Sequence, residues 1–126
     1  GIRVRIVTPH IPDKWYVLEV TRSFYHPLVE AGVEIYEYTP GFIHAKQAVA
    51  DGRIGVIGTI NFDYRSFFLH QECAVWLFES PALADMQRDF EATLALSQRI
   101  TLEDCLAVPW PRRLLRAILT TFAPMM

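Results

Sequence analysis

The sequence predicts an α/β fold in which a mixed β-sheet is flanked by helices. An expected strand at 2–7, a helix at 13–31 and a strand at 33–38 follow one another, which implies parallel pairing through a right-handed crossover. Two apolar, β-branched runs within 44–59 are typical of a β-hairpin. An apolar strand and a long helix follow within 73–98. This alternation of strands and helices favours the α/β class.

The first expected strand alternates apolar and basic residues, as in Ile2-Arg3-Val4-Arg5-Ile6-Val7. The helix that follows carries an apolar stripe at helical spacing, and Pro27 should kink or restart it. The stripe consists of Tyr16, Val20, Phe24, Leu28 and Ala31. Gly32 should end this helix, so the second strand is expected to begin at Val33.

Asp51-Gly52 joins the two runs of the expected hairpin, because this pair readily takes the positive φ of a two-residue turn. With such a turn Lys46 would lie opposite Ile57, and His44 would lie opposite Thr59. Side chains alternate along a strand, so His44 and Lys46 should point to the same side. The expected register therefore gathers polar side chains on one face of the hairpin.

Four kinds of polar group meet in this patch: the imidazole of His44, the ammonium of Lys46, the hydroxyl of Thr59 and the amide of Asn61. Histidine near neutral pH can attack phosphorus or move a proton. The other three groups can hold phosphoryl oxygens and the charge that builds on them. These groups supply the positive potential themselves. The patch therefore predicts chemistry at a phosphate ester with no metal and no cofactor.

The C-terminal part is expected to contain a strand followed by helices. Cys73 should lie in the core of the strand 73–78, and Ser80 should cap a helix over 81–98. The inward stripe of this helix consists of Leu83, Met86, Phe90 and Leu94. A short turn is expected around 101–106.

The last segment, 112–122, is sharply two-sided on a helical wheel. Its apolar face consists of Leu114, Leu115, Ile118, Leu119 and Phe122. Its basic face consists of Arg112, Arg113 and Arg116. Two interpretations stay open: a helix on an anionic membrane surface, or a helix docked on the core of its own domain. The chain accordingly divides into an expected domain at 1–109 and an amphipathic helical tail at 110–126.

Size and composition narrow the function further. With 126 residues, the chain is expected to form at most one domain, and its net charge of −2 argues against nucleic acid as the main partner. Cys73 and Cys105 fit no metal-ligand or redox spacing, so both are expected to be reduced, as on a cytoplasmic face. No apolar run is long enough to span a bilayer. Because the chain opens on Gly1 without an initiator Met, we expect further residues upstream.

The polar patch is part of a longer pattern, H-x-K-x4-D-x6-G-T-x-N. Its residues are His44, Lys46, Asp51, Gly58, Thr59 and Asn61. The pattern resembles the HKD motif of the phospholipase D superfamily. The continuation 61–67 and the segments 8–14, 36–42 and 100–105 resemble bacterial cardiolipin synthases. The resemblance covers nearly all of the chain, as the C-terminal half of such an enzyme. It implies a phospholipase D-like α/β/α sandwich of which this chain is an incomplete half.

The resemblance implies phosphatidyl transfer through a phosphohistidine intermediate. The histidine of the upstream motif is usually the nucleophile, so His44 would be the general acid and base. Glu72 would hydrogen-bond the far nitrogen of His44 and stabilise its charged form. Asp51, although a motif residue, would chiefly hold the hairpin turn. His44, Lys46, Asp51 and Glu72 are thus the expected catalytic residues.

The expected phosphate ligands are Lys46, Thr59, Asn61 and Arg65. For Arg65 a salt bridge with Asp63 is an equally open alternative. The implied partners are anionic phospholipids such as phosphatidylglycerol, a membrane surface, and a second HKD motif from an upstream half or a homodimer partner. The expected location is the cell membrane, with the active site on the cytoplasmic side. Two rivals remain: a dimeric phosphodiesterase or nuclease of the same superfamily, and a catalytically inert half domain.

Overall fold

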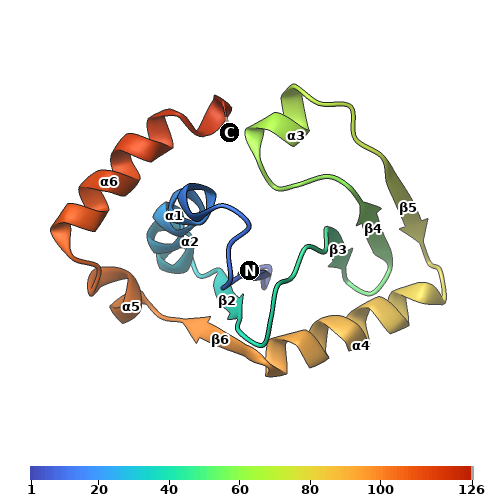
Figure 1. Ribbon diagram of the computed structural model, residues 1–126. Coiled ribbons are helices and arrows are strands. Elements are labelled where there is room, and N and C mark those ends of the chain that lie inside the picture. Colours follow the sequence, from blue (N-terminus) through green and yellow to red (C-terminus); the bar gives the residue numbers. More distant parts are fainter. Residues whose placement is uncertain (126) are drawn as a thin grey trace. The chain divides into compact units, whose positions relative to one another are not determined.

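A computed structural model describes residues 1–125, and the chain forms two compact units (Figure 1). Unit 1 consists of Gly1–Ile43 together with the chain from Leu96 onward, and unit 2 consists of His44–Ala95. Each unit has a three-stranded sheet and its own helices, which confirms the α/β class.

The described part of unit 1 contains β1 (Arg5–Pro9), α1 (Trp15–Ser23), α2 (Tyr25–Glu30), β2 (Glu34–Tyr38), β6 (Ser97–Ile100), α5 (Leu102–Leu106), α6 (Trp110–Thr121) and a 3₁₀ turn (Ala123–Met125). Unit 2 contains β3 (Gln47–Ala50), β4 (Ile54–Gly58), α3 (Tyr64–Phe68), β5 (Ala74–Phe78) and α4 (Ala82–Ala95).

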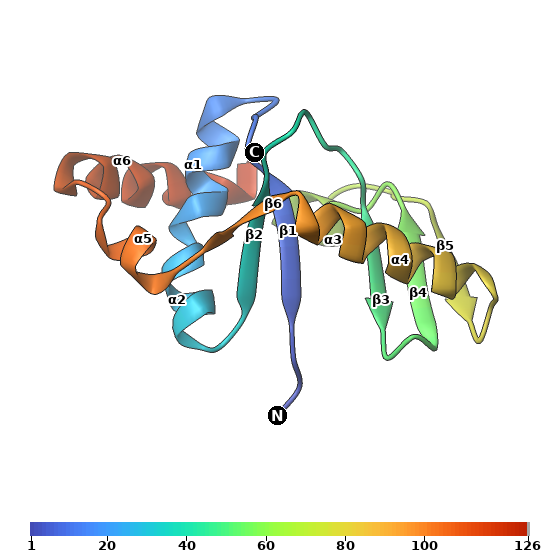
Figure 2. The same cartoon turned by 90° about the horizontal axis from the view of Figure 1, so that it is seen from below.

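The sheet of unit 1 has the strand order β1-β2-β6 (Figure 2). Strands β1 and β2 pair in parallel, as the strand–helix–strand pattern predicted. Strand β6 pairs antiparallel with β2, placing Ile35 opposite Ile100. The predicted helix over 81–98 is therefore wrong at its end, because α4 stops at Ala95. Residues 97–100 instead pair with β2, whose backbone groups would otherwise form an open sheet edge.

The core of unit 1 includes Leu18, Tyr25 and Ile35, all buried. The predicted stripe is wrong in part, since Phe24 is 45 % exposed. The helix is interrupted at Phe24 and restarts as α2, which changes the face that each later residue presents. Pro27 thus lies in the first turn of α2, where its missing N–H breaks no intrahelical hydrogen bond.

A buried carboxylate, Glu37, connects the sheet of unit 1 to α1 and α2. Its carboxylate accepts hydrogen bonds from Nε and Nη2 of Arg22, each at 2.7 Å, and from the hydroxyl of Tyr25 at 3.1 Å. His10 Nδ1 lies 2.7 Å from Oε2 of the same carboxylate. Burial by itself would raise the pKa of Glu37, but the hydrogen bonds from Arg22 and His10 outweigh it and lower the pKa.

The sheet of unit 2 is antiparallel in the order β3-β4-β5, and α4 packs on one face. Leu83 is almost fully buried there, as predicted, and Gly55 lies directly beneath it. A Cβ on Gly55 would stand 2.5 Å from Leu83 Cδ2, so glycine lets Leu83 pack closely on β4, and a larger residue would require this side chain to shift. The prediction that Cys73 lies in the core is wrong: it is exposed, because β5 is an edge strand and Cys73 precedes it.

The hairpin turn is confirmed, but its register differs by one residue from the expected one. Asp51 and Gly52 have φ angles of 52° and 65°, and Arg53 N–H donates to the Ala50 carbonyl at 3.0 Å. Pairing then begins with Ala50 opposite Ile54, because Arg53 is an extra residue on the β4 side. The predicted opposite pairs are therefore wrong. Gln47 lies opposite Ile57, where Lys46 was expected, and the Lys46 carbonyl accepts from Gly58 N–H at 3.1 Å.

Candidate active site beside the hairpin of unit 2

The motif residues all lie in unit 2, and most lie at one end of its sheet. His44 and Lys46 precede β3, Thr59 and Asn61 follow β4, and Glu72 precedes β5. Neighbouring strands run antiparallel, so the start of β3, the end of β4 and the start of β5 meet at the same edge (Figure 2). The one-residue shift in register leaves this gathering intact, because it depends on strand direction.

The two remaining motif residues, Asp51 and Gly58, shape the backbone. Asp51 lies in the turn at the opposite end of β3 and β4, where its positive φ shapes the hairpin. Gly58 is the last residue of β4, and a Cβ there would overlap the Cys73 carbonyl oxygen and the Ala74 backbone. Glycine at this position therefore allows β5 to approach β4 closely.

Glu72 is fixed by neutral hydroxyl groups. Thr59 Oγ1 donates to Oε2 of Glu72 in a short hydrogen bond, and the Thr59 oxygen accepts from Cys73 N–H at 3.1 Å. The hydrogen bonds from Thr59 and Ser66 lower the pKa of Glu72 below its usual range. The Thr59 hydroxyl proton thus goes to Glu72 in this structure, while the expected role of Thr59 toward phosphate stays a prediction.

Lys46 places a positive charge near the carboxylate of Glu72. Its Nζ donates to the His44 carbonyl oxygen at 3.1 Å, so the two motif residues are connected through the backbone of one and the side chain of the other. Burial lowers the pKa of Lys46, and the charges of Glu72 and Asp63 oppose that shift. His44 itself is exposed. The hydrogen bond from His44 to Glu72 stays a prediction.

Ser66 is a buried residue of the site that the sequence analysis overlooked. It is 7 % exposed, and its Oγ accepts from Asn61 N–H at 3.2 Å. Its own N–H donates to Asp63 Oδ1 at 2.7 Å, which caps α3. Ser66 therefore ties the Asn61 loop to the Glu72 carboxylate. The aspartate three residues before it is a helix N-cap signal that predicts the start of α3.

Arg65 contacts His70 and does not form the alternative salt bridge with Asp63. Its Nε donates to His70 Nε2 at 2.9 Å, and Asp63 acts as the helix cap instead of its ion-pair partner. His70 also contributes a charge interaction that lowers the pKa of Glu72. The role of Arg65 toward phosphate stays a prediction.

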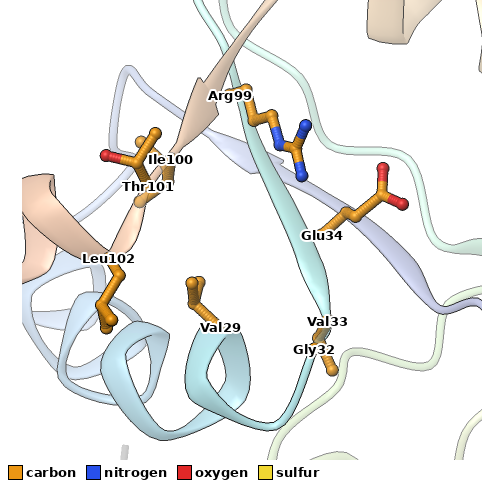
Figure 3. Close-up of a pocket in the computed structure, with 8 residues that line it drawn as sticks. All are labelled: Val29, Gly32, Val33, Glu34, Arg99, Ile100, Thr101 and Leu102. Carbon is orange, nitrogen blue, oxygen red and sulfur yellow. The ribbon is translucent and has the colours of Figure 1, made fainter.

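A pocket of about 270 Å³ lies elsewhere, in unit 1, and holds none of the motif residues (Figure 3). It is lined by Val29, Gly32, Val33, Glu34, Arg99, Ile100, Thr101 and Leu102. The Glu34 carboxylate at its edge is paired with Arg3, whose Nε and Nη2 lie 2.6 and 3.0 Å from it. Across residues 1–125, no three His, Cys, Asp or Glu residues are arranged to hold a metal ion. The candidate site is thus the edge of the unit 2 sheet at which β3 and β5 begin and β4 ends.

Comparison with known proteins connects this site to a family. Residues 1–94 match the family described as "Cardiolipin synthase, PLD-like domain". An uncharacterized protein of Streptococcus mutans is 46 % identical over 101 residues, which is 80 % of this chain and 22 % of that protein. The cardiolipin synthases of Halalkalibacterium halodurans and Geobacillus kaustophilus are 37 % and 36 % identical over 126 residues, all of this chain and 25 % of each relative.

This chain thus spans about a quarter of the length of the curated relatives that it matches. No solved structure matches it. The family match covers most of the chain, including every motif residue from His44 to Glu72. The chain therefore belongs to the phospholipase D-like domain family of cardiolipin synthase.

Proposed function

We propose that this chain supplies one of the two HKD motifs of a phosphatidyltransferase that makes cardiolipin and glycerol from two molecules of phosphatidylglycerol. One observation carries the proposal. An imidazole, an ammonium and a carboxylate held by two hydroxyls lie at the same edge of the unit 2 sheet. The names of the relatives, cardiolipin synthases, support the choice of substrate.

The proposed reaction proceeds in two displacements. A histidine nitrogen attacks the phosphorus of one phosphatidylglycerol, and the bond from phosphorus to the oxygen of the headgroup glycerol breaks. A second histidine protonates the departing glycerol. A hydroxyl of a second phosphatidylglycerol then attacks the phosphorus, gives its proton to that second histidine, and breaks the phosphorus–nitrogen bond. His44 is assigned the acid and base role, and the other motif would provide the nucleophile.

The remaining residues of the site would bind and orient. Lys46, Asn61 and Arg65 would donate to the phosphoryl oxygens, with Thr59 at the same edge. Glu72 would accept from the far nitrogen of His44, fix its tautomer and stabilise its charged form. With these roles, the proposed reaction would need no metal and no cofactor.

A single motif cannot run a mechanism that needs two histidines. We therefore propose that the second motif comes from an upstream half of the same polypeptide or from a symmetric copy of this chain. The proposed location is the cell membrane, with the site on its cytoplasmic side, where both lipid substrates are accessible. The 126-residue chain alone is expected to show little or no turnover.

The decisive experiment is a chimera in which this chain replaces the matching segment of the Halalkalibacterium halodurans cardiolipin synthase. Cardiolipin and glycerol formation from phosphatidylglycerol vesicles should be restored. His44→Ala should then lower turnover by at least about 100-fold, the lower range for losing a general acid–base. His26→Ala, at an exposed histidine of unit 1, is the matched control and should keep full activity. Equal activity of the two variants would show that His44 is not catalytic.

The same chimera separates the proposal from its two rivals. Plasmid DNA offered in place of vesicles should stay intact, in keeping with the acidic net charge. Cleavage of DNA by the chimera without lipid turnover would favour the nuclease. A folded chimera whose turnover is unchanged by His44→Ala would favour the inert half domain.

A further inference from the structure

The helix α6 (Trp110–Thr121) presents its two faces in an unusual way. The chain from residue 107 to its end contains three arginines and no acidic residue. Successive residues of a helix are turned by about 100°, which places Arg112 and Arg116 on one side and Leu114 and Ile118 on the other. A helix of a water-soluble domain normally turns its apolar side toward the core. In α6 the polar side does so.

The arginine side of α6 is bound to α1. Arg112 and Arg116 both donate to the carboxylate of Glu19, with Arg116 Nε at 2.7 Å. Glu19 is 7 % exposed, and hydrogen bonding to Arg112 and Arg116 lowers its pKa to about 2 against the effect of burial. The hydroxyl oxygens of Ser23 and Thr120 lie 3.0 Å apart further along the same two helices. These contacts determine which side of α6 faces α1.

The apolar side of α6 faces away from α1. Four of its side chains are exposed: Trp110 by 74 %, Leu114 by 54 %, Ile118 by 52 % and Phe122, just after the helix, by 47 %, while Leu119 is half-buried. Each of the four exposed residues is four positions from the next, so they form one continuous stripe. A contiguous apolar stripe of this length marks an interaction surface. In Figure 1 α6 is the red-orange helix at the C-terminal end of the chain.

The charge at the edge of the stripe indicates the partner. Arg113 is exposed and donates its guanidinium protons to the carbonyls of Leu106 and Val108, so it has no carboxylate partner within residues 1–125. Its uncompensated charge, the absence of acidic residues in α6, and Trp110 at one end of the stripe match an interface of acyl chains and anionic headgroups. A partner protein that carries both acidic and basic residues would not require a helix whose charged residues are all basic.

We propose that α6 docks unit 1 on the surface of a bilayer containing anionic phospholipid, with the stripe of Trp110, Leu114, Ile118 and Phe122 in the headgroup region and its arginine side on α1. This rests on the proposed function only in that the substrates would lie in the same bilayer. The docking itself needs no turnover. No helix in the described part of the chain is long and apolar enough to cross a membrane, so α6 would lie along the surface.

The test uses the 126-residue chain with Trp15→Phe and Trp76→Phe, which leaves Trp110 as its one tryptophan. Vesicles of phosphatidylglycerol should shift Trp110 emission to the blue and sediment with the protein. Phosphatidylcholine vesicles should bind roughly tenfold more weakly, as expected when one to two basic charges contribute at the surface. Arg113→Glu should remove most of this difference. Equal binding to both vesicles, or no binding, would overturn the proposal.

Two double variants locate the contact. Leu114→Glu with Ile118→Glu should lower vesicle binding by at least about tenfold, because two charges enter the stripe. Leu102→Glu with Leu106→Glu, an exposed pair of the same spacing in α5, is the matched control and should bind like the parent chain. Circular dichroism checks that both variants fold. Equal loss in both, or a stripe that instead mediates dimerisation without lipid, would overturn the proposal.

This test is distinguishable from that of the proposed function. His44→Ala should leave vesicle binding unchanged while turnover of the chimera is lost. Leu114→Glu with Ile118→Glu should lower vesicle binding whether or not His44 is catalytic. Loss of vesicle binding in His44→Ala would contradict the assignment of docking to α6.

Discussion

Unit 1 and unit 2 each hold a carboxylate of lowered pKa, and they hold it in opposite ways. In unit 1 Glu37 is buried and is bonded by the guanidinium of Arg22 and by His10. In unit 2 Glu72 is partly exposed, and its closest partners are the neutral hydroxyls of Thr59 and Ser66. A charge neutralised inside a domain serves the fold. A charge held by hydroxyls at an open edge keeps its ability to attract an imidazolium or another cation.

The largest expected effect is on folding, at Glu37. Glu37→Ala should lower the free energy of unfolding by about 3–5 kcal/mol, because Arg22, whose side chain is mostly buried, would lose the carboxylate that compensates its charge. Urea denaturation of the 126-residue chain measures this. Asp85→Ala, at an exposed ion pair with Arg88, is the control and should cost less than about 1 kcal/mol. Similar losses in the two variants would remove the contrast between buried and exposed charges.

Acid should weaken unit 1 through the same groups. Glu19 has a pKa of about 2 in the fold against an ordinary value of 4.5, and the pKa of Glu37 is also lowered. A lowered pKa in the folded state adds stability that is complete above the unfolded value and disappears as pH falls toward the folded one. Thermal denaturation between pH 7 and pH 2 should thus show a melting temperature that begins to fall near pH 4.5. Glu19→Gln should flatten this dependence, and a melting temperature that rises on acidification would contradict it.

Glu72 should matter for turnover far more than for stability. Glu72→Gln keeps the shape and can still accept from Thr59 and Ser66, so the chain should fold normally. Turnover of the cardiolipin synthase chimera should fall by about 100-fold, because the proposed partner of the His44 imidazole loses its charge. Glu79→Gln, at an exposed ion pair with Arg53, is the control. A near-normal turnover rate for Glu72→Gln would mean that another group orients His44.

Two glycines of β4 test the packing behind the site. Gly58→Ala should cost about 1–3 kcal/mol, because the new Cβ meets the backbone of Cys73 and Ala74. Gly55→Ala should cost less, since Leu83 is a side chain that can move aside. The unfolding free energies of the two variants measure the difference. A larger loss at Gly55 would mean that α4 is the more rigid neighbour.

The smallest expected effect is at Ser66. Ser66→Ala removes the hydroxyl that joins the Asn61 loop to Glu72, and should cost about 1 kcal/mol of stability. Turnover of the chimera should fall only a few-fold, because Thr59 still holds Glu72. A loss of turnover as large as that of Glu72→Gln would show that Ser66 does more than position its neighbours.

Much of this protein follows from local sequence pattern. The α/β class, the parallel pair β1 and β2 and the Asp51-Gly52 turn are all predictable, because each depends on spacing or on positive φ within a few residues. The gathering of His44, Lys46 and Glu72 at one edge is also predictable, since it depends only on the direction of successive strands.

Tertiary structure decided what depends on distant partners. The extra residue at Arg53 changed the hairpin register, and pairing with β2 made residues 97–100 a strand although they continue a helical pattern. The orientation of α6 likewise depended on Glu19, 93 residues before Arg112 along the chain. A helical wheel shows that one side is apolar and the other basic. Only the position of a buried carboxylate on another helix determines which side faces the protein, because an ion pair forms where its partner lies in space.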